Sequence, residues 1–425
     1  MKTRFSKLMA IVMVFALIVA FAAIPASAAT SYTDLVVNSS TANHSTTLKK
    51  YLVVDEDATI PNKTFTFSVA AGTAVAATDS TVAVIPGPVV TEASAVTKPT
   101  IVQTTAFAPT DTTYTTVQSG DTSVTLSTGQ KYAKQNVVVD LDGVTFDEPG
   151  VYRYVLTENA QTSPYSITGS NPLYLDVYVV NDTGTALKID GYVLHSDKSA
   201  PASNTTSGTA ETSGNTKADG FKNEYDTKNI TVSKTVSGNQ ASKDKYFAFT
   251  VNIAGATAGD KYVVSYANDS NENTLDGNAD ASISANPNAA TTVINTAVTQ
   301  PAELTVGNDG TVSQVFYLQD GQSFVIRGLG KGVTYTVTEN EEDYTPAVSV
   351  TGDADAADVD NTSGGTFGKT GTVDDDITAA FTNTRQGVIP TGVLLTVAPF
   401  AIGLLLFGAL AVFFVAKKKK RAEEE

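Results

Sequence analysis

Two glutamates close two similar short segments of the sequence, GVYRYVLTEN at residues 150–159 and GVTYTVTEN at residues 332–340. Alternate residues of a strand share a face, so Glu158 and Glu339 each follow a row of apolar side chains. A charged carboxylate is costly to bury there, and a buried acid keeps its proton more tightly. One such glutamate would be expected to reach solvent, but the same frame in two segments favours two buried acids.

A lysine and an asparagine recur in the same order around each glutamate. Lys50 and Lys234 stand in alternating apolar segments, and each is followed by a Phe-x-Phe segment. Each half then closes with a Phe-x-Asn segment, which puts Asn223 or Asn383 on the same face as its phenylalanine. Unrelated surface residues are the alternative interpretation. The matching order and parity predict that each half brings one Lys, one Glu and one Asn into an apolar interior.

Three such groups in one interior can form a covalent bond. Burial lowers the pKa of a lysine and raises that of a glutamate, so a neutral amine faces a protonated acid. The amine can attack the carboxamide while the acid relays protons and ammonia leaves. The product is a Lys–Asn isopeptide bond, which needs neither enzyme nor cofactor. We therefore expect no cofactor and no metal, and a chain without cysteine would gain its cross-links this way.

The elements that carry these residues are expected to be strands. Short alternating segments bounded by Gly, Asn, Asp and Pro predict an all-β protein of two tandem immunoglobulin-like β-sandwiches. The expected strands are 46–54, 64–70, 136–141, 151–157, 173–180 and 186–194, then 229–236, 246–253, 261–266, 312–318, 323–327, 334–338 and 377–382. Loops are expected at 196–219, 268–289 and 352–371. The acidic run within the last loop lacks the spacing of an EF-hand.

Both ends of the chain carry membrane signals. Residues 1–28 combine basic residues, an apolar run and a small-residue cleavage site, as a signal peptide does. Residues 393–416 carry no charged side chain, and this run is long enough to span a bilayer. Basic residues follow it at once. The 28 Lys and Arg are outnumbered by 44 Asp and Glu. This balance excludes nucleic acid and anionic membrane surfaces as expected partners.

The order of the lysine, Phe-x-Phe, PGVYxYxxTE and Phe-x-Asn segments resembles a known family. With IPNKTFTF at 60–67, FDEPGVYRYVLTE at 146–158 and ITVSKTVSG at 230–238, the chain is similar to the backbone pilins of Gram-positive bacteria. These FctA-like proteins, of the streptococcal T-antigen type, are built from CnaB-type domains. The resemblance runs from about residue 45 to residue 392.

The resemblance implies roles for the residues already singled out. Lys50 would bond to Asn223 with Glu158 as catalytic acid, and Lys234 would bond to Asn383 with Glu339 as catalytic acid. Lys49 adjoins the first lysine but falls on the opposite face of its strand.

The C-terminal region is similar to a sortase sorting signal. Residues 388–392 read VIPTG directly before the apolar run, and Pro390, Thr391 and Gly392 align with the end of the common LPxTG motif. The resemblance implies cleavage between Thr391 and Gly392. An amine must then attack the acyl-enzyme, and Lys217 best matches the family's acceptor lysine, with Lys198 and Lys222 as rivals.

The expected organisation has six parts: a signal peptide (1–28), an N-terminal domain (29–225), a C-terminal domain (226–387), a sortase motif (388–392), a transmembrane segment (393–416) and a cytoplasmic charged tail (417–425). The resemblance implies a pilus shaft subunit on the surface of a Gram-positive bacterium. Its partners would be a sortase, copies of itself and minor pilins, with the membrane only before sorting. A wall-anchored adhesin built from the same domains is the alternative. A surface enzyme is disfavoured, because the two histidines, His44 and His195, stand in no recognisable motif.

Overall fold

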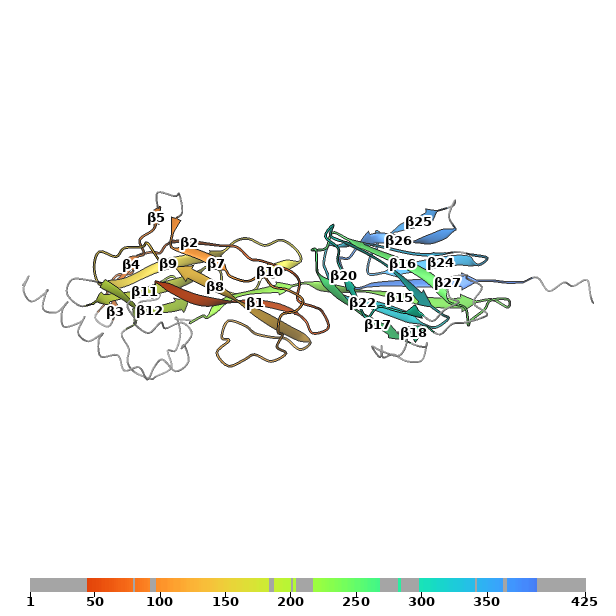
Figure 1. Cartoon of the computed structure of the whole chain (residues 1–425), viewed down its shortest axis with the longest axis horizontal. Helices are drawn as coiled ribbons and strands as arrows, with labels where there is room; N and C mark the ends of the chain where they lie inside the picture. Colours follow the sequence, from red (N-terminus) through yellow and green to blue (C-terminus); the bar gives the residue numbers. More distant parts are fainter. Residues whose placement is uncertain are drawn as a thin grey trace, which may run out of the picture.

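Strands make up every regular element that the structure describes. The computed structural model describes residues 44–78, 81–91, 97–182, 187–199, 202–203, 217–267, 282–283, 298–340, 342–361 and 365–387. The strands form two groups that follow one another along the long axis of the molecule (Figure 1). The prediction of an all-β protein with two tandem sandwiches is confirmed.

The first group is a sandwich of two sheets, in the orders β10-β14-β1-β8-β7 and β12-β11-β9-β2, with β4 parallel to β9. The first sheet contains β10 (Tyr165–Ile167), β14 (Gly220–Tyr225), β1 (Ser45–Asp55), β8 (Gln130–Asp140) and β7 (Thr100–Gln103). The second contains β12 (Leu187–His195), β11 (Leu173–Asn181), β9 (Gly150–Glu158), β2 (Phe67–Ala71) and β4 (Val84–Pro86).

The second group is a sandwich with sheets in the orders β20-β17-β22-β15-β27-β24 and β21-β16-β23-β26-β25. The first sheet contains β20 (Glu303–Thr305), β17 (Lys261–Ala267), β22 (Ser323–Gly330), β15 (Thr227–Ser237), β27 (Ile377–Thr384) and β24 (Thr345–Thr351). The second contains β21 (Thr311–Leu318), β16 (Phe247–Ala254), β23 (Thr334–Asn340), β26 (Thr366–Thr372) and β25 (Ala357–Asn361). Three short pairs complete the set: β3 (Thr81–Val82) with β13 (Ala202–Ser203), β5 (Val90–Thr91) with β6 (Thr97–Lys98), and β18 (Ser282–Ile283) with β19 (Val298–Thr299).

In each sandwich the first long strand lies parallel to the last. β1 pairs with β14, with Lys50 opposite Phe221, and β15 pairs with β27, with Lys234 opposite Phe381. Parallel neighbours cannot be joined by a tight turn, so a long stretch of chain must separate them. Here the other long strands of the sandwich lie between the two in sequence. The start and the end of each sandwich therefore meet in one sheet.

Alternating apolar residues fill the space between the sheets. Leu48, Tyr154 and Phe221, from three different strands, are fully buried in the first core. Val337 and Phe381 are likewise buried in the second core. Burying one such side chain stabilises the fold by about 1.5–3 kcal/mol. The same alternation fixes which polar side chains on these strands must point inward.

The two sandwiches are joined closely. A single residue, Asp226, separates β14 from β15. The loop after β1 reaches the second sandwich, where the backbone N–H of Asn62 donates to Asp260 Oδ1 at 2.7 Å. Arg327 Nη1 donates to Asp57 Oδ2 at 2.6 Å in the same junction. Polar contacts from one loop of the first sandwich thus help to hold the two sandwiches together.

The expectation of a loop over residues 352–371 is wrong for most of that segment. β25 lies within it and most of β26 does too, and β26 pairs with β23. Gly368 allows this polar, glycine-rich sequence to pair closely with β23, because any residue with a Cβ there would place it 1.9 Å from the carbonyl oxygen of Val337. Of the other two expected loops, 268–289 lies outside the described residues except for β18. The segment 196–219 contains the short strand β13 and is otherwise described only at 196–199 and 217–219.

Candidate functional site

Lys50, Glu158 and Asn223 meet inside the first sandwich. Lys50 Nζ donates to Glu158 Oε2 at 2.7 Å and to Asn223 Oδ1 at 2.6 Å. Asn223 Nδ2 donates to Glu158 Oε1 at 2.6 Å. The three side chains form a closed triangle of hydrogen bonds, in which the amine already faces the carboxamide.

Lys234, Glu339 and Asn383 meet in the same way inside the second sandwich. Lys234 Nζ and Asn383 Nδ2 both donate to Glu339 Oε1, at 2.5 Å and 2.6 Å. Within the described residues, Glu339 Oε2 and Asn383 Oδ1 accept no hydrogen bond. The same three residue types therefore meet twice, with a more open hydrogen-bond pattern in the second site.

Equivalent strand registers bring the two sets together. In the parallel pairs, Asn223 lies opposite Leu52 and Asn383 lies opposite Val236, so each asparagine is two residues past its lysine. The glutamate comes from the facing sheet, where Glu158 is paired with Phe67. Glu339 is paired with Phe249 in the same way. We call these two sets of Lys, Glu and Asn the first and the second Lys–Glu–Asn site.

Both sites are almost completely buried, with exposed fractions of 0–1% for all six residues. Burial lowers the pKa of Lys50 and of Lys234 to about 8, although the neighbouring glutamate opposes that shift. Burial also raises the pKa of Glu158 and of Glu339, against the effect of the lysines. The environment thus moves each pair toward the neutral amine and the protonated acid.

An aromatic ring lies against each lysine. Lys50 Nζ is 4.2 Å from the centroid of Phe65, and Lys234 Nζ is 4.1 Å from that of Phe247. These rings belong to the Phe-x-Phe segments that the sequence analysis singled out. By contrast, Lys49 is partly exposed and its Nζ lies 3.4 Å from Asn136 Oδ1. The predicted choice of face for Lys50 agrees with this arrangement.

The three candidate acceptor lysines differ in exposure. Lys217 is exposed and forms an isolated backbone bridge with His195, and Lys198 is also exposed. Lys222 is only 8% exposed, with its Nζ 3.3 Å from Thr125 Oγ1. Burial disfavours Lys222 as an acceptor, whereas the choice between the other two stays a prediction.

The terminal motifs lie outside the described residues. This holds for the expected signal peptide, for Pro390, Thr391 and Gly392, and for the segment 393–416. Within the part of the chain that is described, no helix is long and apolar enough to cross a membrane.

A buried ion pair on the other face of β9 was not predicted from the sequence. Arg153 is fully buried, and its Nε and Nη2 donate to the two carboxylate oxygens of Asp176 at 2.6 Å and 2.7 Å. His195 Nε2 lies 3.2 Å from Asp176 Oδ2. The salt bridges and hydrogen bonds hold the pKa of Asp176 below its usual value, although burial opposes them. The only hint in the sequence was an arginine within an otherwise apolar strand.

A second polar cluster was also missed, behind β1. The hydroxyl of Tyr51 donates to Asp121 Oδ1 at 3.1 Å and also contacts Asp219. Lys134 Nζ donates to Asp121 Oδ2 at 2.9 Å. Backbone N–H groups of the loop that contains Asp121 donate to Asp219. The cluster ties a long loop to the start of β14 and so supports the strand that carries Asn223.

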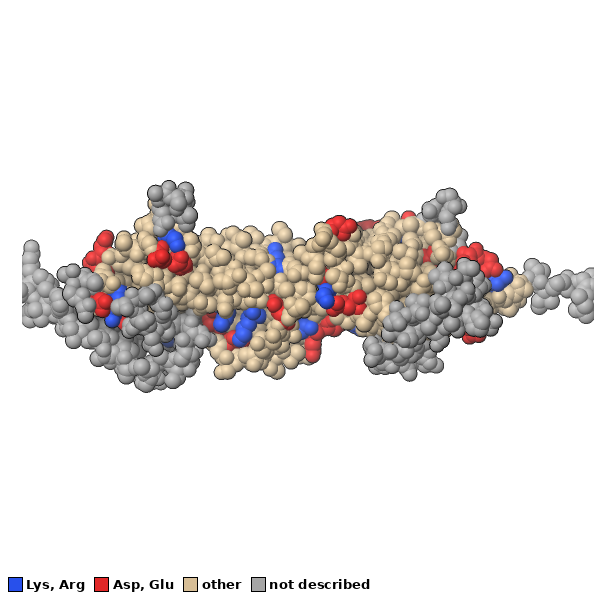
Figure 2. Space-filling view, in the orientation of Figure 1, with Lys and Arg blue, Asp and Glu red and all other residues tan. Residues whose placement is uncertain are grey.

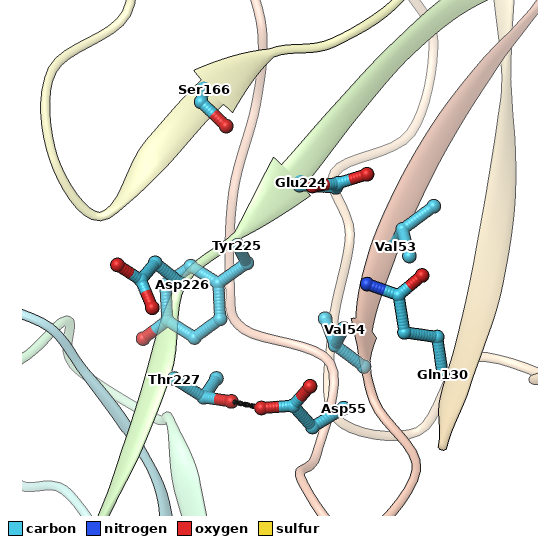
Figure 3. A pocket seen from close by; sticks show the side chains of 9 residues that line it. All are labelled: Val53, Val54, Asp55, Gln130, Ser166, Glu224, Tyr225, Asp226 and Thr227. Atoms are coloured by element: carbon cyan, nitrogen blue, oxygen red, sulfur yellow. Dashed lines mark hydrogen bonds between the residues drawn. The ribbon is translucent and has the colours of Figure 1, made fainter. Parts of the chain in front are cut away.

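A pocket lies at the junction of the two sandwiches, and its lining includes none of the six residues of the Lys–Glu–Asn sites. It has a volume of about 260 Å³ and lies where β1, β14 and β15 meet, and the Thr227 hydroxyl donates to Asp55 across it (Figure 3). No group of three or more His, Cys, Asp or Glu side chains in the described residues is arranged to hold a metal ion. On the face shown in Figure 2, basic side chains are scattered and mostly lie beside acidic ones.

Comparison with known proteins finds a homologous pilin. The chain compared consists of two tandem β-sandwiches, each of which buries one Lys, one Glu and one Asn. A protein named Pilin, from Streptococcus pyogenes serotype M1, is 27% identical over 306 residues, which cover 70% of this chain and 76% of that protein. The chain is homologous to the streptococcal major pilins.

Further matches cover parts of the chain. A family model described as "Domain of unknown function (DUF7601)" matches residues 228–385. The pilus tip adhesin Cpa of Streptococcus pyogenes is 32% identical over 167 residues, which cover 39% of this chain and 18% of the adhesin. The crystal structure of the major pilin from Streptococcus pyogenes overlaps 81% of this chain and all of that one, at 21% identity and a TM-score of 0.48.

Proposed function

We propose that the chain is the shaft subunit of a pilus, polymerised covalently by a sortase and stabilised by two self-formed Lys–Asn isopeptide bonds. The observation that carries the proposal is the repeated meeting of a buried lysine, glutamate and asparagine. A structural ion pair alone would not require the asparagine, nor the same strand register in both sandwiches.

In each site the reaction would begin with transfer of one proton from the lysine to the glutamate. The neutral amine of Lys50 then attacks Cγ of Asn223, which forms the new C–N bond. Glu158 returns its proton to the departing nitrogen, the Cγ–Nδ2 bond breaks, and ammonia leaves. The attacking nitrogen gives up its second proton through Glu158 to this ammonia, which leaves a neutral amide. The net change converts a lysine ammonium and a carboxamide into a secondary amide and an ammonium ion. No oxidant or other reactant is needed, and Lys234, Glu339 and Asn383 would react alike.

The position of the bonds suits a protein that carries tension. Each bond would join the first long strand of a sandwich to the parallel last strand. A pull applied at the two ends of the sandwich would then pass through the covalent bond. The strands between them would carry little of the load and would not need to unfold.

Polymerisation would use the two ends of the subunit. A sortase would cleave between Thr391 and Gly392 and transfer the Thr391 carbonyl to a lysine of the next copy. Lys217, exposed at the entry to β14, is the proposed acceptor, with Lys198 as the rival. Removal of residues 392–425 by this step would release the subunit from the membrane to the cell surface. Minor pilins would join by the same chemistry.

A wall-anchored adhesin is the second candidate function. It is favoured by the partial match to a pilus tip adhesin. The two functions differ in the material released from cell walls. A ladder of high-molecular-weight bands on denaturing gels supports the shaft, and its loss in Lys217→Arg would identify the acceptor. A single monomeric band would refute the shaft role.

Intact mass measures the internal bonds directly. A chain of residues 29–387 should weigh less than its sequence by two ammonia molecules. Glu158→Ala and Glu339→Ala should each restore one, as should Lys50→Ala, because each removes one participant of one site. Lys49→Ala is the matched control and should keep both losses. A wild-type chain of full calculated mass would end the proposal.

A further inference from the structure

A second lysine lies beside each Lys–Glu–Asn site, and both come from one repeated sequence pattern. Residues 63–67 read Lys-Thr-Phe-Thr-Phe and residues 245–249 read Lys-Tyr-Phe-Ala-Phe. The last phenylalanine of each pattern is the strand partner of the glutamate in its own sandwich. The pattern is therefore fixed in register relative to the reacting groups.

In the first sandwich, one phenylalanine ring lies close to two lysines. Lys50 Nζ lies 4.2 Å from the centroid of Phe65, and Lys63 Nζ lies 5.5 Å from the same centroid. Lys63 Nζ is also 4.4 Å from the ring centroid of Tyr165. Aromatic faces attract cations at these distances. The two rings therefore hold the Lys63 ammonium beside the first site.

The second sandwich repeats this arrangement. Lys234 Nζ lies 4.1 Å and Lys245 Nζ 5.4 Å from the centroid of Phe247. Lys245 Nζ is also 5.4 Å from the ring centroid of Tyr344. Lys245 is only 3% exposed, and it forms a salt bridge with Glu342. A buried lysine is costly unless it is paired, and Glu342 supplies the partner that lets Lys245 keep its charge there.

The two tyrosines also occupy equivalent positions. β10 pairs with β14, and Ile167 lies opposite Asn223. β24 pairs with β27, and Pro346 lies opposite Asn383. Each tyrosine stands two residues before the residue that faces the asparagine. The lysine, the shared phenylalanine and the tyrosine thus recur together, which independent surface residues would not do.

We propose that Lys63 and Lys245 are positioning residues of the cross-linking reaction. Each holds a second positive charge beside its glutamate and so sets the pH range in which the reacting lysine and glutamate share a single proton. The inference rests on the proposed cross-linking. It assigns a role to two residues that do not themselves form or break a bond.

The reactive state explains why a nearby charge matters. The reacting pair must hold one proton between its two groups, so cross-linking fails at low pH, where both groups are protonated, and at high pH, where neither is. A neighbouring cation disfavours proton binding and lowers both apparent pKa values of the pair. Removing that cation therefore moves the whole bell-shaped pH profile to higher pH, whichever chemical step limits the rate.

The charges around each glutamate agree with this role. Lys50 and Lys63 both act to lower the pKa of Glu158, against the effect of burial. Lys234 and Lys245 act in the same way on Glu339. Among the described residues, Asp320 lies near Lys234, and Glu342, Asp343 and Arg385 lie near Lys245.

The second lysine matters again once the bond has formed. Cross-linking converts Lys50 into a neutral amide, so the cation that faced Glu158 most closely is lost. A buried, ionised carboxylate without a partner costs several kcal/mol. Lys63 then remains to balance the charge of Glu158, so that the departing nitrogen can leave as ammonium.

The test follows cross-linking during refolding. The chain of residues 29–387 is purified from inclusion bodies in urea and diluted into buffers over a range of pH. Ammonia loss in each sandwich is timed by mass spectrometry of cross-linked peptides. In Lys63→Met the optimum of the first site should rise by about 0.5–1 pH unit, which is the effect of one partly screened charge. The second site of the same molecules, which should not change, is the internal control.

Two further variants separate charge from packing. Lys63→Arg keeps the positive charge and should keep the wild-type optimum. Lys245→Met should shift only the second site, and it provides an independent test if the first sandwich of Lys63→Met folds poorly. An unchanged optimum in both methionine variants, or an equal shift in Lys63→Arg, would overturn the inference while leaving the cross-links in place. A wild-type chain that never loses ammonia would overturn the cross-linking itself.

Discussion

The two Lys–Glu–Asn sites share their strand register but not their hydrogen bonds. In the first site Lys50 donates to both of its partners, and the triangle is closed. In the second site both donors meet at Glu339 Oε1, and the carbonyl oxygen of Asn383 has no partner among the described residues. Strand pairing therefore brings the three groups together, because the register is the same in both sites while the hydrogen bonds differ.

A second difference concerns what surrounds the strands that carry the glutamates. Five residues before the glutamate, β9 has the buried Arg153 and β23 has the exposed Thr334. The outer face of β9 is covered by the segment after β2, where the N–H groups of Gly72 and Gly87 both donate to the Arg153 carbonyl. Thus the outer face of β9 is buried at Arg153, whereas that of β23 is exposed at the equivalent Thr334. Closer to the glutamates, the outer faces of both strands are partly exposed.

The largest effect is expected from removing one asparagine at a time. Asn223→Ala opens a loop of 173 residues, and Asn383→Ala opens one of similar length. Loss of such a cross-link should lower the free energy of unfolding of that sandwich by about 5 kcal/mol, because the unfolded chain regains conformational freedom. Calorimetry of residues 29–387 would measure both transitions. Asn340→Ala, in an exposed position, is the control.

The stability losses in Asn223→Ala and Asn383→Ala can also be compared with each other. Chain entropy makes the two losses nearly equal, because the loops are similar in length. A difference of more than about 1 kcal/mol would therefore reflect the hydrogen bonds of the uncross-linked sites. Equal stability of the wild type and both variants would contradict the presence of the bonds.

A smaller effect is expected at the outer face of the glutamate strands. Arg153→Met leaves Asp176 buried without its cation and should destabilise the first sandwich by about 3–5 kcal/mol. Thr334→Val, at the equivalent exposed place, should change the second by less than about 0.5 kcal/mol. Urea unfolding measures both. Both ammonia losses should persist in Arg153→Met, and failure of cross-linking there would show that the ion pair also positions the first site.

The smallest effect depends on pH. In Asn223→Ala the lysine cannot react and keeps a folded-state pKa of about 8, against 10.5 when unfolded. The folded state then binds fewer protons than the unfolded state between these values, so stability rises with pH across this window, by up to about 3 kcal/mol. The cross-linked wild type lacks this titrating group.

The measurement compares the two chains at each pH. The stability gap between the wild type and Asn223→Ala should narrow from pH 8 toward pH 10.5. Asn383→Ala should behave alike, because Lys234 has the same lowered pKa. A stability gap that does not change across this range would mean that the lysine is in the same state in the wild type and in the variant. It would then be free of a cross-link in both chains or exposed to solvent in both.

The inward-facing residues were predictable from the sequence because alternation within a strand is a local property. The alternating segments repeated in the two halves predicted that Lys50 and Glu158 point inward. The closing Phe-x-Asn segment predicted the same for Asn223. The same logic rejected Lys49, which lies on the more exposed face of β1.

The covering of the outer faces was not predictable, because it depends on segments remote in sequence. Arg153 is buried by residues about 70 to 80 positions earlier in the chain and is neutralised by Asp176 on a neighbouring strand. The second lysines were missed for a related reason. Lys63 and Lys245 lie just outside the alternating segments, so only the rings of Tyr165 and Tyr344, which are remote in sequence, reveal their common place.

The junction between the sandwiches has a consequence for a polymer of such subunits. One residue separates β14 from β15, and the Asn62–Asp260 and Asp57–Arg327 contacts lie beside it. Bending the subunit at this junction would therefore break several polar contacts at once. A fibre built from these subunits would be stiff within each repeat and would flex where one subunit meets the next. Its persistence length would then be set by the joints that the proposed sortase reaction would make.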